Sequence, residues 1–116
     1  MKRSLVVLIV AVLPVFGPPG ISQAMSADRT APTAAKTVKM VNFAFQPATI
    51  SIQRGTKVVW RNTSTTNHTS TSDTGVWDSG IVAPGASFSR VFRARGTFKY
   101  HCSIHPTVMK GTVKVQ

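Results

Sequence analysis

The stretch GTFKYHCSIHPTVMKGTVKV, residues 96–115, predicts two β-strands joined by one compact loop. In the first strand Phe98, Tyr100 and Cys102 alternate with polar residues. In the second strand Val113 and Val115 show the same alternation. Successive side chains of a strand point to opposite faces, so these three residues share one face. The only cysteine of the chain therefore lies on a strand face with two aromatic residues.

Short β-rich runs divided by turn residues extend this pattern through residues 37–116, without a sustained helical period. Such strands, with turn signals at this spacing, predict an all-β fold, a Greek-key β-sandwich. The expected strands are TVKMVNF, ATISI, KVVW, SFSRVF, TFKYHC and GTVKV. In SFSRVF, Arg90 falls on the face of Phe88 and Phe92, so we expect an edge strand or a bulge there.

The first residues have the order of a secretory signal peptide, which we place at residues 1–24. A positively charged start precedes an apolar run at residues 5–16, and Ser22 and Ala24 flank the expected cleavage site. The apolar run is too short to span a bilayer comfortably. We therefore expect a periplasmic or otherwise exported protein with no stable membrane anchor after cleavage, a retained anchor being the alternative.

Two further segments follow the predicted signal peptide. Residues 25–36 contain small and polar residues with one proline, which predicts a flexible N-terminal arm. Residues 37–116 have the length of one small domain, and such a domain buries only roughly two-thirds of its unfolded surface. We expect it to be a monomer.

A lone cysteine in an exported chain needs an explanation, because it cannot form a disulfide within the chain. Ligation to a metal would protect the thiol and would stabilise the fold. Cys102, His105 and Met109 follow one another in a Cys-x₂-His-x₃-Met pattern, so one loop can gather all three around an ion. His68, in the long polar segment at residues 62–75, offers a fourth ligand from another part of the chain.

This set of donors indicates copper. Thiolate and thioether sulfur are soft ligands and imidazole is intermediate, which suits an ion that changes between Cu(I) and Cu(II). Two histidines and a cysteine in a trigonal arrangement, with a weak axial methionine, form the electron-transfer type of copper site. His101 is not expected to be a ligand, because strand alternation turns it away from the face of Cys102.

Residues 37–116 resemble the single-domain cupredoxins of the plastocyanin, amicyanin and pseudoazurin group. The resemblance runs through VNFAFQPATISIQRGTKVVWRN, NHT and GTFKYHCSIHPTVMKGTVKV. It implies a β-sandwich with one type 1 (blue) copper ion and a soluble one-electron carrier. The copper ligands that it implies are His68, Cys102, His105 and Met109.

Other residues are expected to support such a site. Asn62 and Asp73 are predicted to organise the ligand loop by side-chain-to-backbone hydrogen bonds. Thr69 stands where plastocyanin and azurin carry asparagine, which changes the hydrogen bonding near the sulfur. The spacing from His105 to Met109 is longer than in amicyanin and shorter than in plastocyanin, and it equals that of azurin.

The resemblance also implies a docking surface. His105 would lie in an exposed loop, where the edge of its imidazole would be the route for the electron. Pro106, Thr107 and Val108 would form a small apolar patch around it.

The charge of the chain indicates the kind of partner. There are 14 Lys and Arg against 3 Asp and no Glu, and removing Lys2 and Arg3 from the net charge of +11 leaves +9. Such a balance steers acidic partners by long-range attraction, so we expect redox proteins with acidic docking surfaces. Nucleic acid is not expected, because the protein is exported and its cations are scattered singly.

Several other functions remain open at this stage. A copper carrier or storage protein would use the same ligands without transferring electrons. An enzyme with Cys102 as its nucleophile has no support beyond a cysteine and histidines, and we expect none. Zinc is disfavoured because methionine is a poor zinc ligand, and three histidines are too few for a multicopper oxidase.

Overall fold

The computed structural model of the protein describes residues 34–116. The predicted signal peptide and most of the predicted arm lie outside the described residues. β1 (Ala34–Val41) begins inside the segment that the sequence predicts as the arm. Its first residues pair in parallel with β4 (Thr56–Asn62), from Ala34 opposite Thr56 onward, and this pairing explains the earlier start. Within residues 34–116 no helix is long and apolar enough to cross a membrane.

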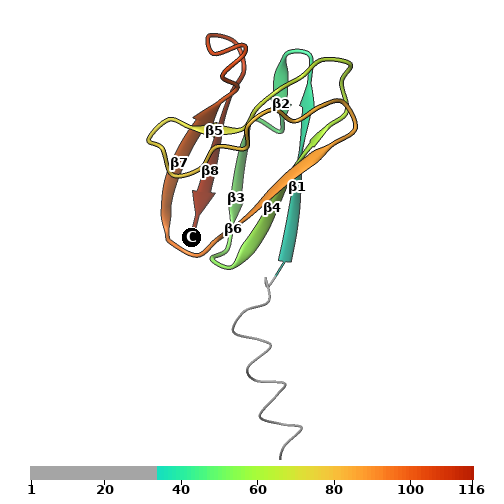
Figure 1. The fold of residues 1–116 in the computed structure, drawn as a ribbon. Helices are drawn as coiled ribbons and strands as arrows, with labels where there is room; N and C mark the ends of the chain where they lie inside the picture. The colour runs from blue at the N-terminus through green and yellow to red at the C-terminus, as the bar shows by residue number, and fades with distance from the viewer. Residues whose placement is uncertain (1–33) are drawn as a thin grey trace, which may run out of the picture. The chain divides into compact units, whose positions relative to one another are not determined.

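Two four-stranded sheets make up the fold, which confirms the predicted all-β class (Figure 1). The first sheet has the order β2-β1-β4-β6 and the second the order β3-β8-β7-β5. β1 pairs with β4, and β3 with β8, in parallel, and the other pairs are antiparallel. The remaining strands are β2 (Ala44–Gln46), β3 (Thr49–Ile52), β5 (Thr71–Ser72), β6 (Ser87–Phe92), β7 (Gly96–His101) and β8 (Lys110–Val115).

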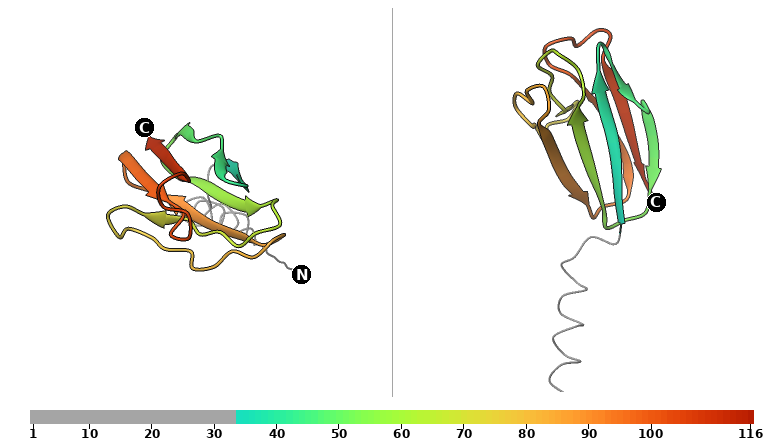
Figure 2. Two further views of the ribbon diagram at one scale, coloured as in Figure 1. Left: turned by 90° about the horizontal axis from the view of Figure 1, so that it is seen from above. Right: turned by 90° about the vertical axis from the view of Figure 1, so that its right-hand side faces the viewer.

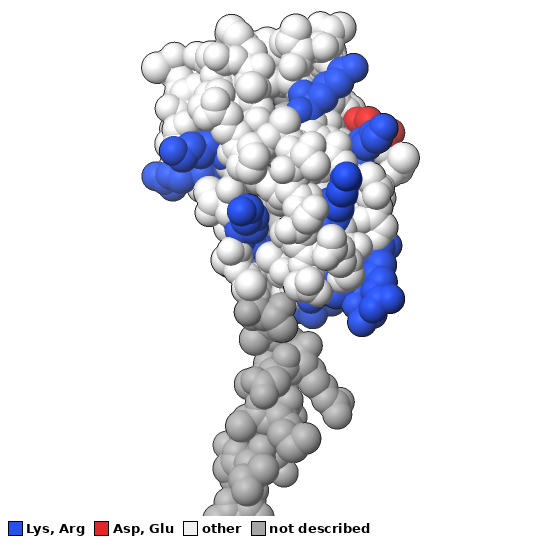
Figure 3. Space-filling view, turned by 180° about the vertical axis from the view of Figure 1, so that it is seen from behind, with Lys and Arg blue, Asp and Glu red and all other residues white. Residues whose placement is uncertain are grey.

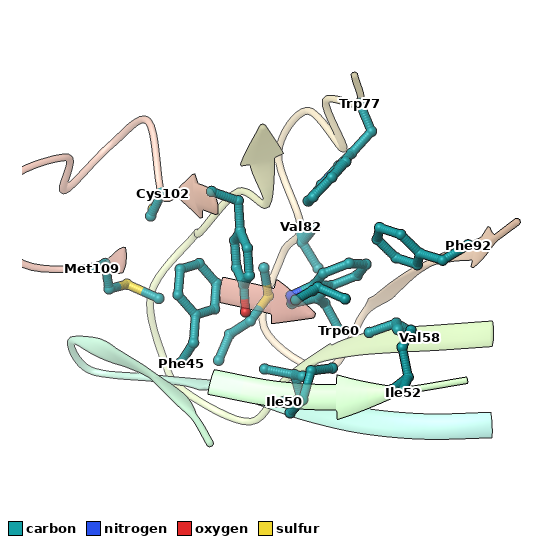
Figure 4. Packing of buried hydrophobic residues seen from close by; sticks show 14 of the residues in the cluster. Phe45, Ile50, Ile52, Val58, Trp60, Trp77, Val82, Phe92, Cys102 and Met109 are labelled. Carbon is teal, nitrogen blue, oxygen red and sulfur yellow. The ribbon is translucent and has the colours of Figure 1, made fainter. Parts of the chain in front are cut away.

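The core lies between the two layers, which face one another in Figure 2. Alternating residues of β4 are buried, and Trp60 at its centre is fully enclosed. Its ring lies 5.4 Å from that of Tyr100 in the opposite sheet and 5.7 Å from that of Trp77, between ring centroids. Aromatic contacts of this kind stabilise a core beyond the area that they bury. Figure 4 shows this cluster, with Cys102 and Met109 together at one end of it.

β6 is an edge strand, as its sequence predicts, and it pairs with β4 in a regular register without a bulge. Arg90 lies on the inner side of this edge. Its guanidinium carbon is 5.6 Å from the centroid of the Trp77 ring and 5.4 Å from that of Phe92. A guanidinium over aromatic faces is attracted by their π electrons, so Arg90 covers the open edge of the core.

Three connections meet at one end of the sandwich, at the top of Figure 1. They are the turn between β1 and β2, the loop that follows β4, and the loop between β7 and β8. β7 pairs with β8 in antiparallel fashion, from Gly96 opposite Val115 to His101 opposite Lys110. Cys102 follows the last of these pairs and therefore lies at this end. The predicted site residues are carried by these loops.

Candidate metal centre

Cys102 is the centre of a group of three potential metal ligands. It follows β7 directly and is fully buried. Its Sγ lies 3.8 Å from Nδ1 of His68 and 3.6 Å from Nδ1 of His105. The three ligand atoms all lie within 4.8 Å of one another. The structure therefore brings together three of the four residues predicted as ligands, from segments far apart in the chain.

These distances suit a single ion with trigonal ligands. In metalloproteins a thiolate sulfur lies about 2.3 Å from a bound ion such as zinc, and an imidazole nitrogen about 2.0 Å. Two such atoms separated by about 120° at the ion are about 3.7 Å apart. The separations of 3.8 and 3.6 Å agree with this value. The His-Cys-His group is thus positioned to hold a metal ion.

Backbone hydrogen bonds fold the loop after β7 around the cysteine. The amide of His105 donates to the carbonyl of Cys102 at 3.1 Å, and that of Met109 donates to the carbonyl of His105 at 3.0 Å. The amide of Cys102 then donates to the carbonyl of Met109 at 2.9 Å, which closes the loop. Met109 is fully buried at the same end of the core as Cys102 (Figure 4).

Asn62 organises the loop that carries His68. It is fully buried at the end of β4, and its Nδ2 donates to the carbonyls of Thr66 at 2.7 Å and Val82 at 2.8 Å. Its Oδ1 accepts from the amide of Ser64 at 2.9 Å. His68 also exchanges backbone hydrogen bonds with Val82, at 3.2 and 2.7 Å. The contacts of Asn62 are of the kind that the sequence predicts.

The environment of His68 favours its neutral form. Burial lowers its pKa below 6.5, and the neighbouring His105 lowers the pKa further. Removal of a cation from water, and repulsion from a second one, both disfavour protonation. A neutral imidazole keeps a lone pair on one ring nitrogen, which is the form that can bind a metal.

Thr69 ties the two ligand loops together. Its amide donates to Sγ of Cys102 at 3.3 Å, and its Oγ1 accepts from the amide of Ser103 at 2.8 Å. The hydroxyl also contacts that of Thr71 at 2.9 Å. A hydrogen bond to the sulfur stabilises the charge of a thiolate, and such contacts adjust the properties of a bound metal.

His101 lies away from this group. Its Nδ1 is 2.6 Å from Oδ1 of Asp73, and both side chains are accessible to solvent. Asp73 was expected to hold the ligand loop through its carboxylate, but this carboxylate pairs with His101 on the outer side of the sheet. The prediction for Asp73 is wrong because cross-strand neighbours in space, which spacing along the chain does not reveal, determine its partner.

Two residues in the turn between β1 and β2 join the site without any prediction from the sequence. Oδ1 of Asn42 lies 3.1 Å from Nε2 of His68. The ring centroid of Phe43 lies 4.7 Å from that of His105 and 6.2 Å from that of His68. Nothing in the spacing of Asn42 and Phe43 links them to histidines so much later in the chain, and only the fold reveals the contact.

The predicted docking residues surround a half-buried His105. Pro106, Thr107 and Val108 are exposed, Val108 with 66% of its surface accessible. Phe43, which is 48% exposed, adds a second large apolar side chain beside His105.

A known domain family and two known proteins of similar sequence match large parts of the chain. A family model described as a cupredoxin-like domain matches residues 6–115. Amicyanin-alpha of Methylorubrum extorquens is 31% identical over 98 residues, which are 80% of this chain and 82% of the relative. Plastocyanin of Scenedesmus fuscus is 33% identical over 84 residues, which are 62% of this chain and 86% of the relative.

Solved structures share the fold. The purple cupredoxin from Nitrosopumilus maritimus superimposes with a TM-score of 0.64 at 26% identity, over 70% of this chain and 99% of that one. The copper-containing nitrite reductase from Thermus scotoductus superimposes with a TM-score of 0.66 at 26% identity. That match covers 71% of this chain and only 22% of the reductase, so the likeness is confined to one part of a much larger protein.

Proposed function

The chain belongs to the cupredoxin-like family, and on this premise we propose that it is an exported, monomeric one-electron carrier with one copper ion. The proposed ligands are His68, Cys102, His105 and Met109. The observation that carries the proposal is the buried thiol with an imidazole Nδ1 on either side, at 3.8 and 3.6 Å.

The chemistry of the donors fits copper. Two imidazoles with a thiolate suit both oxidation states, and a thioether sulfur adds a weak axial donor. The free, buried sulfur of Cys102 is the soft donor of this set, and the amide of Thr69 donates a hydrogen bond to it. When bound, the ion would supply a one-electron redox couple.

The protein would hold the ligands still while the electron is exchanged. Asn62 fixes the loop of His68, and the closed backbone ring from Cys102 to Met109 fixes the other ligands. If the ligands barely move when the ion changes its oxidation state, the reorganisation energy of electron transfer stays low. No substrate bond is made or broken in this role, so the proposal does not include an enzymatic reaction.

His105 is proposed as the route between the site and a partner. It is the half-buried member of the group, and Phe43, Pro106 and Val108 surround it with exposed apolar surface. The partner is proposed to be a redox protein with an acidic docking surface. Lys and Arg side chains are spread over the body of the domain in Figure 3, while the topmost described atoms belong to neither charged class.

The test is the visible absorption spectrum of the protein loaded with Cu(II). We expect an intense blue or purple colour that a reductant bleaches and an oxidant restores. The variant Cys102→Ser should lose this colour while keeping its fold, because serine offers no thiolate. A colourless protein that binds Cu(I) tightly would instead support a copper carrier or storage role.

A further inference from the structure

The contact between Asn42 and His68 crosses from the turn after β1 to the loop after β4. His68 is fully buried, and Oδ1 of Asn42 lies 3.1 Å from its Nε2. The same oxygen accepts a hydrogen bond from the hydroxyl of Thr66 at 2.8 Å, which holds the amide in place. Asn42 is adjacent to Val41, which pairs with Ala44 across the hairpin, so its backbone is also held.

The chemistry of this contact assigns the hydrogen on the imidazole. An amide oxygen can only accept, so Nε2 of His68 is the donor and carries the hydrogen. In the neutral ring Nδ1 then keeps its lone pair. Nδ1 is the nitrogen that lies 3.8 Å from Sγ of Cys102. The contact thus leaves the lone pair on the side of the ring where the other potential ligands lie.

We propose that Asn42 is a positioning residue that fixes the ring orientation and the protonated nitrogen of His68. Its role in metal binding rests on the proposed copper site. Hydrogen bonds to the outer nitrogen of a ligating histidine raise its basicity and orient it, and their loss typically costs about 10- to 100-fold in metal affinity. Aspartate at this position would keep the acceptor oxygen and add a negative charge.

The experiment has one readout that needs no copper. In the metal-free protein, NMR should show a hydrogen on Nε2 of His68 that exchanges slowly with solvent. Asn42→Ala should make this hydrogen exchange fast, whereas Asn42→Asp should keep it protected. Thr66→Val is the matched control, because it removes the other hydrogen bond to Oδ1 and leaves the acceptor for His68.

The second readout is the affinity for Cu(II), measured by competition with a chelator. We expect Asn42→Ala to bind about 10-fold or more weakly and Asn42→Asp to restore the affinity. A hydrogen on Nδ1 in the unsubstituted protein overturns the inference, even if the alanine variant fails to fold. Equal exchange or equal affinity in Asn42→Ala overturns it as well. Failure of the unsubstituted protein to bind copper would refute the proposed function, while the NMR result would still decide the role of Asn42.

Discussion

His101 and Cys102 are neighbours in sequence, but their side chains leave the strand on opposite sides. His101 pairs with Asp73 on the outer face of the sheet, whereas Cys102 is fully buried beside His68. We therefore expect His101→Ala to leave the visible spectrum of the Cu(II) protein nearly unchanged. His105→Ala, four residues after His101, should abolish this spectrum or shift it strongly. A spectrum lost in the His101 variant would show that strand alternation misassigned the ligand.

Tyr100 shares the inner face of β7 with the cysteine, and burial raises its pKa from 10.0 to about 12. Between pH 10 and 12 the unfolded chain releases the phenolic proton while the folded protein retains it. The free energy of unfolding should therefore fall across this range, by about 3 kcal/mol for two pKa units, and stay unaffected by Tyr100 below pH 10.

The comparison with Tyr100→Phe isolates this contribution. Lysines titrate in the same pH range in both proteins, so their effect cancels in the difference between the two unfolding curves. We expect denaturant unfolding to show a smaller loss of stability above pH 10 in the phenylalanine variant. Parallel losses in the two proteins would mean that the phenol is not buried in its neutral form.

The pairing of β7 with β8 depends on a residue without a side chain. Gly111 lies opposite Tyr100 in the register, and a Cβ built on it would overlap the phenol ring. Because β7 and β8 are the two inner strands of their sheet, neither can move away easily. Overpacking typically costs about 1–3 kcal/mol. Gly111→Ala should lose stability of this order in denaturant unfolding. Thr112→Ala, the next residue on the same strand, should change stability little, and an equally stable Gly111→Ala would refute the tight packing.

How much of these elements the sequence predicts depends on how local their signals are. The alternation of Phe98, Tyr100 and Cys102 predicts β7 because every inward position is apolar. β1 was predicted to start later, because Ala34 and Ala35 carry no pattern and are strand residues only through their pairing with β4.

The short strands show the same limit. β2 and β5 have three and two residues, too few for a period to appear, and the sequence does not predict either of them.

The site also contains residues that the sequence predicts and residues that it does not. The Cys-x₂-His-x₃-Met spacing lies within one loop and can be seen in the sequence, and the resemblance to cupredoxins adds His68. Asn42 and Phe43 lie in the turn between β1 and β2, in the sheet that does not contain β7 and β8. They reach the site only through tertiary packing, for which a single sequence holds no signal.

At the scale of the whole molecule, charge is the feature that a partner meets first. Asp73 and Asp78 are the only acidic residues among positions 34–116, against many Lys and Arg that are spread over the domain (Figure 3). The domain thus carries a net positive charge, which a small redox reagent meets as it approaches. Such a field raises the rate of encounter with anions and lowers it with cations.

Electron exchange with small metal complexes tests this field without any knowledge of the partner. Oxidation of the reduced copper protein by an anionic iron cyanide complex should slow as salt is added, because screening shortens the Debye length from about 30 Å at 0.01 M to about 8 Å at 0.15 M. Oxidation by a cationic cobalt amine complex should become faster over the same range, since salt removes repulsion instead. Stopped-flow measurements of both rates give slopes of opposite sign if the net charge governs approach. Two flat profiles would mean that the reagents reach the site through its uncharged end without steering, and an acidic partner would then lose its physical basis.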